Sequence, residues 1–202
     1  MAGVTVPNLP GDMLRVAGID PSLTSTGVAV ALISEAGTVV DRVTRTVVSK
    51  GTKGDSLDAR YARLRVLVAR IVDVADGSDL VVIESPAHSR VTGSHHDRSG
   101  LWWLLVQEFR ECSLASIVEV SPSARAKYIA GKGNAAKDAV LAAAIRRWPE
   151  WDITGNDVAD AVGLLSMGCR SLGHPIETSM PAANLTAMTS VRWPITQEAS
   201  PA

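Results

Sequence analysis

Two apolar segments of the chain each end on a carboxylate and stop at a nearby proline. The first, MLRVAGID, ends on Asp20 and is followed by Pro21, and the second, LVVIE, ends on Glu84 and is followed by Ser-Pro. Runs this apolar are typical of buried strands, where an ionised carboxylate is costly unless water, a positive partner or a metal reaches it. Alternatively, Asp20 only begins a turn, because Asp and Pro are common turn residues. If both segments are strands, each carboxylate lies at an accessible edge of the sheet.

The pattern between and after these segments predicts an α/β domain. Residues 26–34 and 37–50 are β-branched runs, which together with the first strand form an antiparallel meander, and residues 115–120 predict a fifth strand. Apolar residues spaced three and four apart predict amphipathic helices. These helices lie in segments 57–71, 101–112, 134–148 and 154–172, the third with Asn134 as its N-cap and the fourth with a capping box from Thr154 to Asp157.

The length of 202 residues suits one such domain. We expect an N-terminal extension at residues 1–12, the domain at 13–174 and a mobile tail at 175–202, because the tail is rich in Pro, Ser, Thr and Ala and lacks a sustained apolar period. No segment has the basic and apolar pattern of a secretory signal or the length of a membrane span, so we expect a cytoplasmic protein without a membrane partner.

Charge is distributed unevenly along a chain whose formal net charge is −1. The segment between Ser121 and Glu150 is basic, and it surrounds a Gly-rich turn and the start of a helix, where backbone N–H groups favour phosphate. We therefore expect a basic patch on a nearly neutral protein. The residues chosen as candidate phosphate contacts are Arg125, Lys127, Lys132 and Lys137.

Four carboxylates form the candidate reactive centre. Asp157 and Asp160 are three residues apart, so they share one face of the last helix. If the strands that end on Asp20 and Glu84 are parallel neighbours, all four acids can converge. Such a cluster repels itself unless divalent cations occupy it, and hard oxygen ligands suit Mg²⁺ or Mn²⁺. The chemistry best served is two-metal phosphoryl transfer, and the pattern indicates no small-molecule cofactor.

Four ordered blocks, GIDPSLTSTG, VVIESP, AKYIAGKGNAAKDAV and NDVADAVGLL, resemble the successive motifs of the RuvC family of Holliday junction resolvases, including its shorter phage-type members. The resemblance covers about residues 14–172. It implies a ribonuclease H-like fold, in which a mixed five-stranded sheet, a three-strand antiparallel meander plus two parallel strands, carries helices on both faces. It also implies an acidic metal-binding tetrad at Asp20, Glu84, Asp157 and Asp160, with about two metal ions per site. The family's lysines carry over onto Lys127 and Lys137, and Lys137 is taken as catalytic.

The resemblance further implies branched DNA as the partner, a homodimer as the assembly, and a role in DNA recombination and repair. Ser22 stands where bacterial members usually have glycine, and the segment after Glu84, which helps to form the family's dimer, does not align. The helix at 101–112 holds more apolar area than one buried face requires. We therefore expect Trp102 and Trp103 to contribute to the dimer surface, with core packing and base stacking as the alternatives.

Two other functions remain open at this point. DPSLTSTG is also similar to the phosphate-binding first hairpin of actin-like ATPases and sugar kinases, although those chains need a second such loop in a second lobe. The other alternative is a branched-DNA-binding protein without catalysis on the same fold. The presence of all four acids favours the nuclease.

Overall fold

The computed structural model of the protein describes residues 13–86, 94–111, 113 and 115–194. Its centre is one five-stranded sheet, made of β1 (Met13–Asp20), β2 (Ser25–Ser34), β3 (Val39–Val48), β4 (Leu80–Glu84) and β5 (Ser116–Val120). The strand order in the sheet is β3-β2-β1-β4-β5. β1 pairs antiparallel with β2, and β2 pairs antiparallel with β3. On the other side of β1, β4 pairs parallel with β1, and β5 pairs parallel with β4. The predicted mixed sheet is therefore confirmed.

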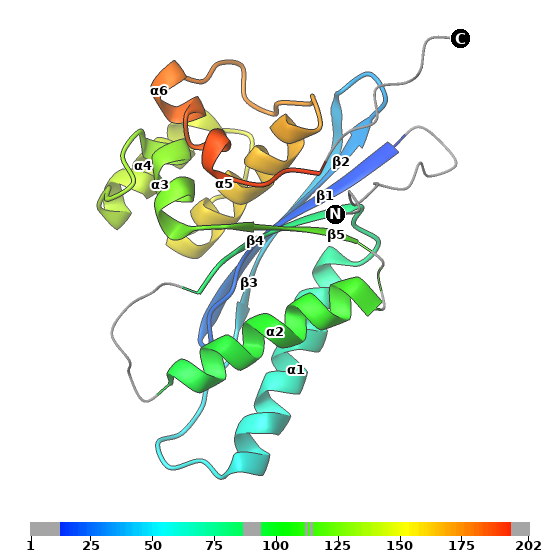
Figure 1. Cartoon of the computed structure of the whole chain (residues 1–202), viewed down its shortest axis with the longest axis vertical. Helices are drawn as coiled ribbons and strands as arrows, with labels where there is room; N and C mark the ends of the chain where they lie inside the picture. The colour runs from blue at the N-terminus through cyan, green and yellow to red at the C-terminus, as the bar shows by residue number, and fades with distance from the viewer. Residues whose placement is uncertain (1–12, 87–93, 112, 114, 195–202) are drawn as a thin grey trace.

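Helices cover both faces of this sheet (Figure 1). On one face lie α1 (Leu57–Ala75) and α2 (His95–Glu111). On the other face lie α3 (Pro122–Ala130), α4 (Lys137–Arg147) and α5 (Asn156–Ser171). Alternate residues of β1 enter the two cores: Val16 packs with α5, whereas Ala17 and Ile19 pack with α1 and α2. Burial on both faces explains why β1 and β4 are apolar without alternation.

The helix α5 lies unusually close to β1 and β2 because two glycines make room for it. A Cβ atom on Gly18 would lie 2.2 Å from the carbonyl oxygen of Ala161, and one on Gly27 would lie 1.9 Å from the carbonyl oxygen of Asp157. Both distances are far below any real Cβ contact, so a larger residue at either position would push the helix off the sheet. The two glycines thus set where the first turns of α5 stand relative to the ends of β1 and β2.

Helix starts differ from the sequence predictions in four places, the first being α2, which begins at His95 rather than at residue 101. Helix α4 begins at Lys137 after Ala136, so Asn134 is not its N-cap, and α5 begins at Asn156 after Gly155 without a side-chain cap from Thr154. Helix α3 is an element that we did not predict; Ser121 caps it by accepting a hydrogen bond from the backbone N–H of Ala124. The capping residues were misplaced because tertiary packing, rather than local side-chain bonding, decides where α4 and α5 begin.

Residues 175–194 pack on the domain, so the expectation of a mobile tail is wrong for them. They include α6 (Ala182–Leu185) and the 3₁₀ turn η1 (Met188–Ser190). Asn184 is buried and donates a 2.8 Å hydrogen bond to the carbonyl oxygen of Tyr128. The segment lacks a helical apolar period because it packs through single side chains, namely Ile176, Met180, Leu185, Ala187, Met188, Val191 and Trp193. Residues 195–202 and the N-terminal extension at 1–12 lie outside the described residues.

Glu177 attaches this segment to the core through a buried polar network. Its fully buried carboxylate accepts hydrogen bonds from the hydroxyl groups of Tyr128 at 3.0 Å and Ser166 at 2.6 Å, and it pairs with the guanidinium of Arg170. Burial and the charge of Glu177 raise the pKa of the Tyr128 hydroxyl, which therefore stays protonated and can donate.

In the described part of the chain, no helix is both long enough and apolar enough to span a bilayer.

We predict that Glu177→Ala lowers the free energy of unfolding by about 3 kcal/mol or more, because it leaves the Arg170 charge and two hydroxyl groups without their buried partner. Urea unfolding followed by circular dichroism measures the change. Glu35→Ala, in the exposed turn between β2 and β3, is the matched control and is expected to change stability by less than about 0.5 kcal/mol. Equal stabilities of the two variants would show that the network does not hold the segment.

Candidate active site

Two carboxylates of the site stand at the ends of neighbouring parallel strands. β1 and β4 pair in register from Val16 with Leu80 to Ile19 with Ile83, so Asp20 and Glu84 follow at the same edge of the sheet. Beyond Asp20, the chain turns at once: Thr26 Oγ1 donates to the carbonyl oxygen of Ser22 at 2.8 Å and accepts from its backbone N–H at 3.0 Å. This short turn keeps Asp20 at the strand end.

The helix α5 supplies the other two carboxylates. Asp157 and Asp160 lie in its first turns, which Gly27 allows to contact the start of β2. Ser25, the first residue of β2, donates a hydrogen bond from its hydroxyl group to Oδ2 of Asp157. All four predicted acids line one cavity of about 340 Å³. The structure therefore brings the four carboxylates together, as the sequence pattern predicted.

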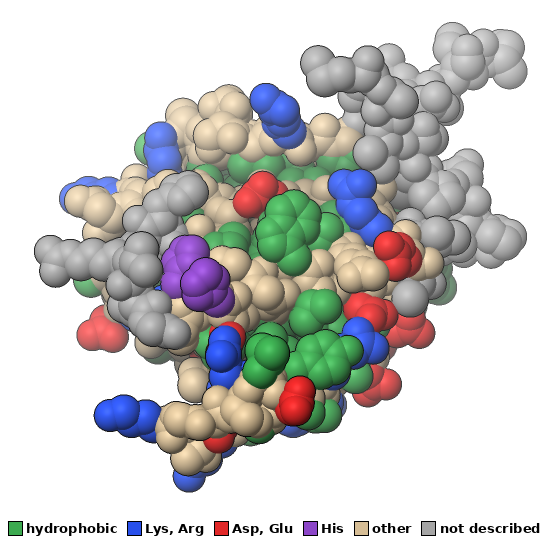
Figure 2. Space-filling view, turned by 60° about the horizontal axis from the view of Figure 1, so that its bottom comes forward, with side chains coloured by type: hydrophobic (Ala, Val, Ile, Leu, Met, Phe, Trp, Pro, Cys, Tyr) green, Lys and Arg blue, Asp and Glu red, His purple; other side chains and the backbone are tan. Residues whose placement is uncertain are grey.

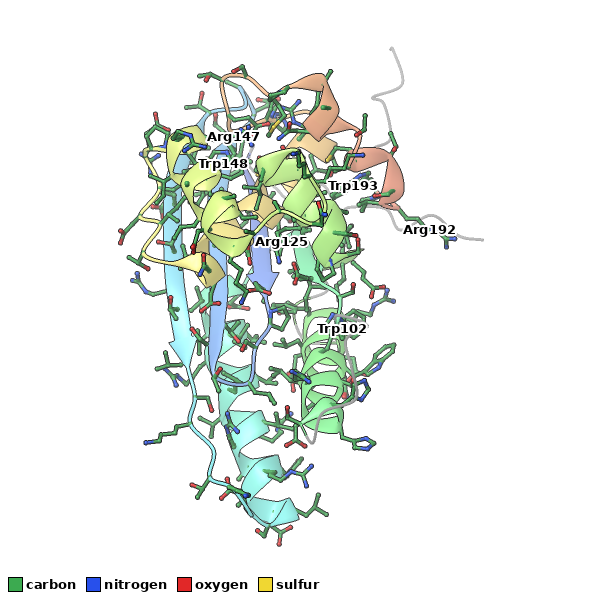
Figure 3. The ribbon with its side chains drawn as sticks, turned by 90° about the vertical axis from the view of Figure 1, so that its left-hand side faces the viewer. Trp102, Arg125, Arg147, Trp148, Arg192 and Trp193 are labelled. Carbon is green, nitrogen blue, oxygen red and sulfur yellow. The ribbon has the colours of Figure 1, made fainter. Side chains whose placement is uncertain are left out.

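Arg125 crosses this cavity from α3. Its Nε donates to Oε2 of Glu84 at 2.6 Å, and its Nη1 donates to Oδ1 of Asp160 at 2.5 Å. The side chains of Arg125, Glu84 and Asp160 are each only 12% exposed. Figure 3 shows Arg125 and Trp102 on the same side of the molecule, from α3 and α2 respectively. Arg125 was predicted as a DNA contact, whereas in this structure it is an ion-pair partner of two of the acids.

The charge balance of the cavity is reflected in the pKa values of its acids. Burial, followed by the repulsion of Glu84 and Asp160, raises the pKa of Asp20 well above its ordinary value, against the opposing effect of Arg125. Burial also raises the pKa of Asp160 to about 7, although Arg125 acts in the lowering direction. Both shifts mean that this site holds its full negative charge only at a cost in free energy. Additional positive charge in the cavity would lower that cost.

The predicted lysines separate into two groups. Lys137, the first residue of α4, lines the cavity together with the four acids. A cation at a helix N-terminus is repelled by the positive end of the helix dipole. Helix stability therefore does not explain why a lysine stands at the start of α4. Lys127 on α3 and Lys132 in the turn between α3 and α4 do not line the cavity. They lie on the same stretch of chain, outside the cavity that holds Lys137.

Helix α2 also lines the cavity, and sequence reasoning included none of its lining residues among the site residues. They are His95, Arg98, Ser99 and Trp102. Trp102 is 9% exposed and donates a 3.0 Å hydrogen bond from Nε1 to the carbonyl oxygen of Glu84, so it helps to hold the end of β4. An indole hydrogen bond to a backbone carbonyl carries no local sequence signal, which is why Trp102 was taken for a dimer contact.

The donor set fits a hard divalent cation, because four carboxylates from three elements share one cavity, and the pKa values of two of them, Asp20 and Asp160, are raised. Among the described residues, however, no three His, Cys, Asp or Glu side chains are grouped as they would be around a bound metal ion. Arg125 lies between two of the carboxylates instead. The chemistry of the residues thus suits a metal, while the spacing in this state is that of an ion-pair network.

Comparisons with known proteins agree with the fold. No protein-family model matches the chain, and no curated protein matches it. Among solved structures, a RuvC from Thermus thermophilus is similar with a TM-score of 0.58 and 19% sequence identity, over 80% of this chain and 98% of that one. The RuvC of T. thermophilus in complex with a Holliday junction substrate is similar with a TM-score of 0.55 and 19% identity, over 75% of this chain and 90% of that one. At this identity, the likeness establishes that the chain has the ribonuclease H-like fold of these RuvC structures.

Proposed function

We propose that this protein is a divalent-metal-dependent endonuclease that nicks branched DNA, with the four-way (Holliday) junction as its preferred substrate. The observation that carries the proposal is the meeting of Asp20, Glu84, Asp157 and Asp160 in one cavity at the carboxyl ends of β1 and β4. The similar fold of a RuvC in complex with a Holliday junction substrate supports the choice of DNA.

In the proposed reaction, the four carboxylates hold about two Mg²⁺ or Mn²⁺ ions. Ions held by these carboxylates would supply Lewis-acid chemistry there, namely activation of a water molecule and stabilisation of the leaving oxygen of the phosphodiester. Other residues in and beside the cavity have separate tasks. Ser25 orients Asp157, Trp102 holds the carbonyl group beside Glu84, and Lys137 places a positive charge where the phosphate enters. Lys127 and Lys132 extend this positive charge along the DNA backbone.

Two alternatives predict different outcomes. A non-catalytic branched-DNA-binding protein would bind junctions and leave them intact in Mg²⁺ and Mn²⁺. A phosphate-binding domain of the actin-like or sugar-kinase type would bind a nucleotide at the turn after β1. Four carboxylates in one cavity oppose both alternatives, because they repel phosphate unless cations are bound. Incubation of the chain with labelled four-way, forked and linear duplexes in Mg²⁺, Mn²⁺ and EDTA separates the three functions.

We predict that Asp20→Asn, Glu84→Gln, Asp157→Asn and Asp160→Asn each reduce junction cleavage in Mg²⁺ by at least about 100-fold, the scale on which one electrostatic group acts in catalysis. Junction affinity should stay the same or increase, because each change removes a charge that repels phosphate. Gel assays of cleavage and of binding measure the two effects separately.

The matched control for these variants is Glu119→Gln, an exposed acid on β5, which is expected to cleave like the natural chain. Unreduced cleavage by Asp20→Asn in Mg²⁺ would refute the assignment of the tetrad. Junction binding without cleavage by the natural chain in either metal would favour the non-catalytic alternative.

Lys127→Ala and Lys137→Ala are predicted to weaken junction binding and to make the slope of log K against log salt shallower by about 1 for each lost phosphate contact. Fluorescence anisotropy in EDTA, from low to moderate salt, measures this slope without cleavage. Arg192→Ala is the control, because Figure 3 shows its side chain pointing away from Arg125 and Trp102. Slopes unchanged from the natural chain in both lysine variants would place these lysines outside the DNA-binding surface.

We also propose that the chain acts as a homodimer, because a two-fold axis supplies two active sites for the two strands of a junction. Exposed apolar side chains on α1 and α2 support a surface there: Trp103 is 65% exposed, and Leu57, Tyr61 and Val66 are exposed as well. Figure 2 turns the end of the molecule that carries α1 and α2 toward the viewer, and hydrophobic side chains lie there among charged ones. Trp102 is buried and bonded to β4, so the surface includes Trp103 rather than both tryptophans.

Trp103→Glu is predicted to give a folded monomer that nicks one strand of a junction but loses paired incision. Val40→Glu, which charges an exposed apolar position on β3, is the control and should keep the assembly of the natural chain. Sedimentation velocity at micromolar concentration, with and without junction DNA, measures the assembly. A dimeric Trp103→Glu variant, or a natural chain that stays monomeric on DNA, would place the interface elsewhere.

A further inference from the structure

Arg125 is a cation placed between two of the proposed metal ligands. One guanidinium bonds Glu84 on β4 and Asp160 on α5 at 2.6 and 2.5 Å, and all three side chains are nearly buried. The inference that follows rests on the proposed function, because it takes these carboxylates as metal ligands.

The start of α3 determines the position of Arg125. The backbone N–H of Ser85 bonds the carbonyl oxygen of Val120 at 2.9 Å, so the end of β5 lies beside Glu84. Ser121 then caps α3 immediately, and the backbone N–H of Arg125 donates to the carbonyl oxygen of Ser121 at 3.0 Å. The side chain of Arg125 therefore leaves the first turn of a capped helix directly beside the end of β4. Its place in the cavity is built into the fold.

A guanidinium and a divalent cation compete for the same carboxylate oxygens. Oε2 of Glu84 and Oδ1 of Asp160 are engaged by Arg125 in this structure. A positive charge within hydrogen-bond distance of both also repels an incoming cation, and this repulsion is strong where water is largely excluded. Arg125 keeps its charge at any working pH, because an arginine side chain remains protonated in proteins.

We propose that Arg125 is a substitute cation of the metal-free chain: it neutralises Glu84 and Asp160 until a divalent cation binds, and it must release both oxygens for the cation to bind there. Arg125 therefore lowers the metal affinity of the site while it stabilises the metal-free fold. The competing explanation is a purely structural ion pair between α3, β4 and α5. That explanation predicts that loss of Arg125 leaves metal affinity unchanged or weakens it, because the carboxylates lose their order.

Isothermal titration of the full chain with Mn²⁺, without DNA, tests the proposal. Arg125→Gln is expected to bind Mn²⁺ about tenfold more tightly than the natural chain, the effect of removing one nearby repelling charge. Arg125→Lys keeps the charge but lacks the guanidinium fork that reaches Glu84 through Nε and Asp160 through Nη1, so its affinity should lie between the two. Arg192→Gln removes a distant positive charge and is expected to bind like the natural chain.

Thermal unfolding supplies a second measurement that does not depend on activity. In EDTA, Arg125→Gln should melt several degrees below the natural chain, and Mn²⁺ should raise its melting temperature by more than it raises that of the natural chain. If Arg125→Gln does not fold in EDTA, Arg125→Lys carries the test. Its tighter binding of Mn²⁺ relative to the natural chain supports the proposal.

The possible outcomes separate this inference from the proposed function. Equal or weaker Mn²⁺ binding by both Arg125 variants, with clear binding by the natural chain that Asp20→Asn abolishes, would overturn the role of Arg125 and leave the metal site intact. No Mn²⁺ binding at millimolar concentration by the natural chain or by either Arg125 variant would overturn the metal site and this inference together.

Discussion

The close approach of α5 to β1 and β2 is the constraint on which the candidate site depends. Two positions without a Cβ atom, Gly18 and Gly27, let the backbone of the helix lie against the backbone of the strands. Asp157 and Asp160 consequently stand beside Asp20 rather than one side-chain layer away. The same contact places Ser25 within hydrogen-bond reach of Asp157. A backbone contact, rather than any attraction between the acids, therefore assembles a group of side chains that repel one another.

This repulsion shapes the rest of the site. Four carboxylates in a cavity of about 340 Å³ are costly to ionise, and the raised pKa values of Asp20 and Asp160 express that cost. Arg125 offsets part of it through two short hydrogen bonds. If these carboxylates hold metal ions, as we propose, the buried Arg125 cation that stabilises the metal-free chain competes with those ions for the same oxygens. In this view, stability of the metal-free fold and affinity for metal are opposed within one cavity.

The resemblance to RuvC motifs rests on residues of the sequence, whereas the structural comparison rests on the fold, and both point to the same architecture. The residue pattern predicted the strands and the acids at their ends, the resemblance implied the mixed sheet, and the structure has the fold of the T. thermophilus RuvC at 19% identity. The pattern misjudged residues 175–194, because that segment is held by single buried side chains and by the carboxylate of Glu177. Such anchoring has no period along the chain, so periodicity cannot detect it.

What the sequence determined by itself was the five strands, four of the helices and the four acids at their ends, because apolar runs of strand length and the three-residue spacing of Asp157 and Asp160 are local properties of the chain. The tertiary structure alone decided how those acids are partnered. The bridge from Arg125 to Glu84 joins residues 41 positions apart, and the bond from Trp102 to the carbonyl oxygen of Glu84 joins residues 18 apart. Neither follows from local pattern, because each depends on where α2 and α3 begin relative to the end of β4.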